Sequence, residues 1–179
     1  MSRLLPSKLS HHSGPLRPFA LALQALDTAA GWAIVTMLGL MVTVVSLQVL
    51  LRYAANSSIG FADELSRLTF VWSIFLGIPL GVRLGAHIGM ELLSSRLPAR
   101  AQDLLARAMA ALAAAMMILV TWQSVVVAFD QWDELLASMN GSAAWFIVAV
   151  AVGCAHSALH LVWIVLTGKP TMTQSVATE

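Results

Sequence analysis

The chain has 179 residues, of which 59% are hydrophobic and only 11% are charged, and its formal net charge is +1. A soluble domain normally carries about a quarter charged residues, so this composition excludes a protein that faces water on all sides. The small net charge gives no electrostatic basis for nucleic-acid binding, and the single cysteine, Cys154, excludes an intrachain disulfide. The long apolar runs predict an all-α membrane protein.

Four apolar segments are long enough to be transmembrane helices, at about residues 28–51, 65–85, 107–129 and 143–167. We expect one four-helix transmembrane domain over residues 19–168, with short amphipathic helical segments at the membrane surface. Residues 1–18 and 169–179 are then tails outside the membrane. The first span is too long for the apolar part of a cleaved signal peptide, so we expect it to remain as an anchor.

The distribution of Lys and Arg predicts the orientation of these spans. Eight of them lie in the two tails and in the loop between the second and third spans, while the other two loops contain only Arg52 and Arg67. Cytoplasmic segments carry the excess of basic residues, so we expect both termini to be cytoplasmic. The eight residues are Arg3, Lys8, Arg17, Arg83, Arg96, Arg100, Arg107 and Lys169.

Helical spacing of apolar residues before the first span indicates that its helix begins ahead of Asp27. Within the span, Gln48 is expected to hydrogen-bond a neighbouring helix. We expect every Asp and Glu, Asp27 included, to lie at a helix end, in a loop or in a tail. The sequence therefore predicts no buried carboxylate that could form a proton relay or an ion site.

The second span begins with Asp63, Glu64 and Arg67, whose spacing allows one local charge cluster on a helix. We expect Glu64 and Arg67 to support helix placement or assembly at the outer membrane interface. Pro79 removes one helical hydrogen bond and is expected to kink the helix. The predicted interfacial charges of this region are Arg52, Asp63, Glu64, Arg67, Arg83 and His87.

Glycines recur at every fourth position along the second span and just beyond it, at Gly77, Gly81, Gly85 and Gly89. This spacing leaves a groove without side chains along one helical face, which favours close packing of another helix. That helix could belong to this chain or to a partner protein. We therefore expect a packing or partner interface along these four residues.

A basic stripe precedes the third span. Its members lie at offsets that share one helical face, which we expect to contact water, lipid headgroups or a protein. They are Arg96, Arg100, Asp103 and Arg107. The third span then begins with an alanine-rich stretch over residues 106–115, which predicts tight packing against a neighbour.

His156 and His160 lie four residues apart in the fourth span and therefore on one face. A bis-histidine haem requires ligands on facing helices, and no other span has a central histidine. Interhelical hydrogen bonding is thus favoured over ligand binding. No nucleophile–base pair, phosphate-binding loop or metal-ligand run is present, so we expect no catalytic residues, no metal and no cofactor.

An ordered set of residues resembles the small permease subunit of TRAP (tripartite ATP-independent periplasmic) transporters, the DctQ family. The set comprises Arg52-Tyr53, Asp63-Glu64 with Arg67, Trp72, Phe75-Leu76-Gly77, Arg83, His87-Ile88 and Leu97-Pro98. Phe61 and Gly89-Met90-Glu91 depart from the pattern of many relatives. The resemblance implies a non-catalytic scaffold in the bacterial inner membrane. Its implied partners are a large permease subunit, a periplasmic binding protein and membrane lipid, in a sodium-driven importer of organic acids.

Two other interpretations of the sequence remain open. One is a four-helix cytochrome b or quinone-linked membrane anchor subunit, for which purified protein would show a haem spectrum. The other is a small transporter that acts alone, for which vesicles containing only this chain would accumulate substrate.

Overall fold

A computed structural model describes residues 17–57, 59–83 and 98–167. Over these residues the secondary structure is helical apart from short connections. The helices are α1 (Arg17–Ala54), α2 (Ala62–Arg83), α4 (Ala99–Asp130) and α5 (Ala144–Thr167). In this described part, all four are long and apolar enough to cross a membrane. The prediction of an all-α membrane protein with four spans is confirmed.

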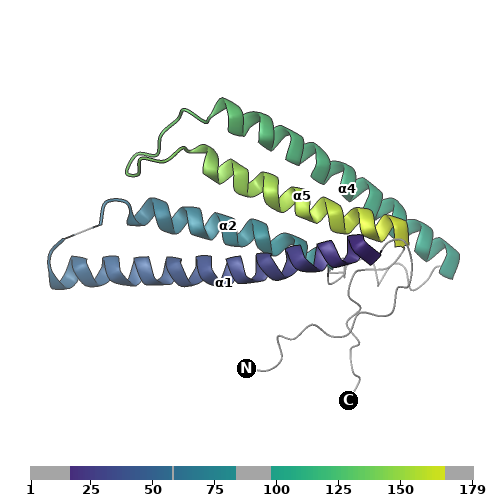
Figure 1. Ribbon diagram of the computed structural model, residues 1–179, viewed down its shortest axis with the longest axis horizontal. Helices are drawn as coiled ribbons and strands as arrows, with labels where there is room; N and C mark the ends of the chain where they lie inside the picture. The colour runs from purple at the N-terminus through teal and green to yellow at the C-terminus, as the bar shows by residue number, and fades with distance from the viewer. Residues whose placement is uncertain (1–16, 58, 84–97, 168–179) are drawn as a thin grey trace, which may run out of the picture.

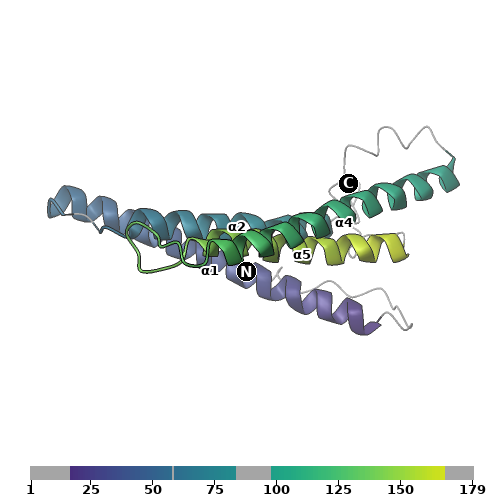
Figure 2. The same cartoon turned by 90° about the horizontal axis from the view of Figure 1, so that it is seen from above.

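The four helices lie side by side in the order α1, α2, α5, α4 and form a single layer (Figure 1). The main packing joins α1 to α2, α2 to α5, and α5 to α4. Seen along the layer, the first turns of α1 and of α4 diverge to opposite sides (Figure 2). The start of α1 and the end of α5 lie at the same end of the layer (Figure 1). Most side chains of a single layer can contact lipid.

The α4–α5 contact is made by small residues of α4 against larger ones of α5. Ala110 and Ala114 are buried against Leu161 and Ile164. Their spacing of four residues places both alanines on the same face, and their methyl groups allow the two helices to approach closely. The expected tight packing of the alanine-rich stretch is confirmed.

The α2–α5 contact depends on Pro79 and Gly153. Proline has no N–H group, so the carbonyl of Phe75 lacks its helical partner. The α5 backbone approaches this carbonyl at Gly153, where an added Cβ would overlap the oxygen and lie 2.8 Å from the carbonyl carbon. Only glycine leaves room for this approach. Helix α2 continues past Pro79 to Arg83.

Helix α1 begins well before the first apolar span that the sequence predicts. The early start brings Phe19 against Trp163 of α5, with ring centroids 5.8 Å apart. Leu23, one helical turn later, is 1% exposed. A buried stripe therefore runs down this end of α1, and the next residue in it is Asp27.

Candidate functional site

Asp27 is buried at the centre of a polar cluster, which corrects the expectation that no carboxylate is buried. Its side-chain Oδ1 accepts hydrogen bonds from Nε2 of His156 at 3.0 Å and Nε2 of His160 at 2.8 Å. An ionised carboxylate can only accept, so each contact is a hydrogen bond when that imidazole carries its proton on Nε2. The two histidines share one face of α5, as their spacing predicts, and form the expected interhelical hydrogen bonds.

Arg83 of α2 completes this cluster from the other side of the carboxylate. Its Nη1 lies 3.2 Å from Oδ2 of Asp27. The exposed fractions are 3% for Asp27, 7% for His156 and 0% for His160. Removing a carboxylate from water is costly unless it is paired and hydrogen-bonded, and here both oxygens have partners. The cluster thereby joins α1, α2 and α5 near the ends where α1 begins and α2 terminates.

Among the predicted interfacial charges, Arg83 lies at the opposite end of α2 from the acidic residues, as its place between the second and third spans predicts. The acidic residues Asp63 and Glu64 occupy the first turn of α2, whereas Arg83 is in the last turn. Arg52 is exposed in the last turn of α1. His87 lies outside the described residues. The predicted set of interfacial charges therefore divides between two ends of the layer.

Glu64 binds the connection between α4 and α5. Its carboxylate accepts from the backbone N–H of Ala137 at 2.8 Å, and from the backbone N–H and hydroxyl of Ser138 at 2.9 and 2.6 Å. The connection is a small hairpin closed by a bridge between Leu135 and Ser142. In the described part of the chain, no ion pair joins Arg67 to Glu64 or Asp63. Glu64 therefore restrains a loop instead of forming the expected local cluster.

Gln48 and Asp63 connect α1 to α2 at the same end of the layer. The amide Nε2 of Gln48 donates to Oδ1 of Asp63 at 3.2 Å. The expected hydrogen bond from Gln48 to a neighbouring helix is confirmed.

The glycine face of α2 has no neighbour within the described chain. A Cβ built at Gly77 or Gly81 meets no atom within 4 Å. Phe70 and Ile74 precede these glycines at helical spacing on the same side, and they are 48% and 46% exposed. We call Phe70, Ile74, Gly77 and Gly81 the α2 outer face. Gly85 and Gly89 lie outside the described residues.

The basic stripe before the third span is described only in part. Arg107 pairs with Asp103 at 3.0 Å, one helical turn apart on exposed side chains. Arg96 lies outside the described residues, and the side chain of Arg100 is not described. Two members of the predicted stripe, Asp103 and Arg107, therefore form an ion pair on the surface of α4.

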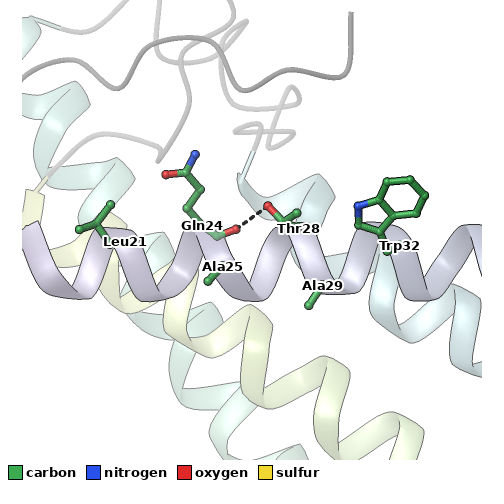
Figure 3. A pocket seen from close by; sticks show the side chains of 6 residues that line it. All are labelled: Leu21, Gln24, Ala25, Thr28, Ala29 and Trp32. Atoms are coloured by element: carbon green, nitrogen blue, oxygen red, sulfur yellow. Dashed lines mark hydrogen bonds between the residues drawn. The ribbon is translucent and has the colours of Figure 1, made fainter. Parts of the chain in front are cut away.

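A shallow depression on α1 is lined by residues of that helix alone (Figure 3). The hydroxyl of Thr28 donates to the backbone carbonyl of Gln24 at 2.9 Å, one turn earlier in the same helix. The lining residues are Leu21, Gln24, Ala25, Thr28, Ala29 and Trp32. It is an open side of one helix, which suits lipid contact more than binding of a polar solute.

Comparison with known proteins gives one family. The family model described as the DctQ component of tripartite ATP-independent periplasmic transporters matches residues 41–168. A Haemophilus influenzae protein, provisionally described as a TRAP transporter small permease protein, is 38% identical over 71 residues. This alignment covers 40% of the present chain and 44% of that protein.

A second relative carries a more specific description. The C4-dicarboxylate TRAP transporter small permease protein DctQ of Vibrio cholerae is 27% identical over 123 residues. That alignment covers 69% of the present chain and 50% of the relative. The matches therefore span half or less of the length of these two relatives.

Proposed function

Since this chain belongs to the DctQ component family of tripartite ATP-independent periplasmic transporters, we propose that it is a non-catalytic scaffold for a larger permease subunit. It is a multi-pass protein of the bacterial inner membrane. In this proposal the large subunit moves an organic acid in a sodium-driven step. A periplasmic binding protein delivers the acid, and the present chain holds the large subunit in place.

The observation that carries the proposal is the single layer of helices. A path for a charged solute must be shielded from lipid on every side, because exposed polar groups are costly in hydrocarbon. A layer that is one helix thick gives shielding on two sides only. It does, however, offer a broad surface on which another membrane protein can pack.

The α2 outer face is the surface that we assign to the large subunit. Helices associate in membranes mainly through close packing, and glycines let two backbones approach. Lipid chains need no such groove. The uncovered positions at Gly77 and Gly81, on a central helix of the layer, support a partner helix at this place. The basic residues support cytoplasmic termini, with the Glu64-bound hairpin on the periplasmic side where the binding protein arrives.

The substrate class in this proposal is a carboxylate-bearing solute. The Vibrio cholerae relative is described as part of a C4-dicarboxylate transporter. Four-carbon dicarboxylates, sugar acids and sialic acids are the classes to screen, using the periplasmic binding protein.

Reconstitution tests this scaffold role. Vesicles that contain the large subunit and this chain, supplied with the binding protein and a sodium gradient, should accumulate the acid. Vesicles with this chain alone should not accumulate it, even with the binding protein present. Uptake by this chain alone would contradict the proposal and favour a small transporter.

A cytochrome b or quinone-linked anchor is the second candidate, and the described histidines bear on it. Both lie on α5 and direct Nε2 to the same carboxylate, whereas a bis-histidine haem in a helical bundle needs ligands on facing helices. An absorption spectrum of the purified chain with a Soret band would favour this candidate.

A further inference from the structure

Besides joining three helices, the buried side chains of Asp27, His156 and His160 bring their donor atoms together. One carboxylate oxygen and two imidazole nitrogens lie within 4.8 Å of one another. We propose that these three residues form a binding site for a divalent transition-metal ion, with Zn²⁺ as the reference ion. The proposal does not depend on the transporter role and concerns this chain alone.

The chemistry of the donors selects the class of ion. Neutral imidazole nitrogens suit zinc, iron, cobalt, nickel and copper, whereas magnesium and calcium prefer oxygen ligands. His156 and His160 supply two nitrogens from successive turns of α5. Two ligands on one helix would be too few, and Asp27 of α1 provides a third from the opposite side. Three protein ligands with a fourth position for water make a common zinc site.

The distances are close to those of a coordinated ion. Oδ1 of Asp27 lies 3.0 Å from Nε2 of His156 and 2.8 Å from Nε2 of His160. Ligand atoms around tetrahedral zinc, at bonds of about 2.0–2.1 Å, are roughly 3.3 Å apart. The two imidazole nitrogens lie within 4.8 Å of each other, so binding would require the rings to turn toward the ion and the helices to separate by a few tenths of an ångström. Each ring would then carry its proton on Nδ1 and present the Nε2 lone pair to the metal.

Arg83 is compatible with such a site, and it sets a limit on affinity. It contacts Oδ2 of Asp27, so Oδ1 can bind the ion while the other oxygen keeps its hydrogen-bond partner. Carboxylate ligands commonly have an outer partner of this kind. The guanidinium charge nevertheless repels a cation and stabilises the carboxylate when no ion is bound. We therefore expect an ion that exchanges with a chelator instead of one that is permanently held.

Metal binding to the whole chain in detergent tests the proposal. The protein carries His11→Gln and His12→Gln so that the tail histidines do not bind the ion, and it is stripped with a chelator first. Calorimetry with Zn²⁺ should then give one site per chain. Replacing Zn²⁺ with Co²⁺ should give the intense visible absorption of a low-coordinate nitrogen–oxygen site.

The variants identify the ligands. His156→Gln and His160→Gln should each lower the Zn²⁺ affinity at least about tenfold, the scale on which metal sites respond to the loss of supporting groups. Cys154→Ala is the matched control, because it removes a buried potential ligand two residues from His156 and should leave the affinity unchanged. Circular dichroism checks that each variant remains helical.

Two results would overturn the metal site. One is protein with only the two tail substitutions that remains folded after stripping and binds neither Zn²⁺ nor Co²⁺. The other is binding that persists unchanged in both histidine variants, which would show an adventitious ion only. Either result would leave the cluster as an ion-paired contact between helices.

Discussion

At Asp27, the burial of one side chain links three helices. The carboxylate is almost fully covered and is shared by Arg83, His156 and His160. The uncharged segment of the first span starts at Thr28, so the sequence places Asp27 at the end of that span and not within the protein interior. The signal that identifies it is the apolar spacing of Phe19 and Leu23, which continues to Asp27 on the same helical face. Its partners are more than fifty positions away, and spacing within one helix cannot reveal them.

Asp27→Asn should destabilise the chain because it removes the negative charge between Arg83 and the two histidines. Breaking a buried ion pair costs about 3–5 kcal/mol, and we expect the lower end because Arg83 is 22% exposed. Thermal unfolding in detergent, followed by circular dichroism, measures this. Asp103→Asn is the matched control, since its ion pair with Arg107 is exposed. Equal melting temperatures for the two variants would contradict a structural role for Asp27.

Gly153→Ala should loosen the α2–α5 contact, because its Cβ would overlap backbone atoms of Phe75 that no side-chain rotation can move. Overpacking of this kind costs about 1–3 kcal/mol. Gly77→Ala is the control, because a Cβ there meets no atom of the described chain. Unfolding of the isolated chain in detergent should separate the two variants. If the Gly153→Ala chain is as stable as the wild type, the close approach of α5 to the Phe75 carbonyl is refuted.

Among the elements, the sequence predicts the four helices well and their neighbours poorly. Hydropathy identifies each span, and the spacing of His156 and His160 predicts that they share a face. In a membrane, however, residues that face lipid are as apolar as residues that face protein. The order α1, α2, α5, α4 therefore has no signature in hydropathy. Glycine spacing predicts a close helix contact at Gly77 and gives no such signal at Gly153. In the structure, Gly153 makes the close contact within the chain.

Glu64→Gln should release the hairpin between α4 and α5. Glutamine has one acceptor oxygen and no charge, so it cannot hold the amides of Ala137 and Ser138 together with the serine hydroxyl. Hydrogen exchange at these two amides should become faster while exchange in the α5 interior is unchanged. Asp63→Asn, next in sequence but bonded to Gln48, should leave the hairpin amides unaffected. Unchanged exchange in the Glu64 variant would show that the contact does not restrain the loop.

For the whole molecule, the four helices form a single layer. A single layer does not enclose a path that polar side chains could line for a charged solute. Among the described residues, the buried charged and histidine side chains form one cluster, and many large hydrophobic side chains are exposed. The resemblance at residues such as Asp63, Glu64 and Arg67 indicates the family, and the match over residues 41–168 confirms it. Glycine spacing in the sequence predicts a packing face on the second span but does not say whether the neighbour belongs to this chain; in the structure, no described residue meets a Cβ at Gly77 or Gly81.

Co-purification tests the central claim most directly. The tagged chain, expressed with a large TRAP permease subunit from the same organism, should elute with that subunit as one complex in size-exclusion chromatography. Gly81→Leu should reduce the yield of complex several-fold, because its side chain fills the groove of the α2 outer face. Gly39→Leu, at an equally open position on α1, should not. A wild-type chain that stays folded and elutes without the large subunit would contradict the scaffold role. A full yield of complex with the Gly81→Leu chain would show that the large subunit does not bind at the α2 outer face.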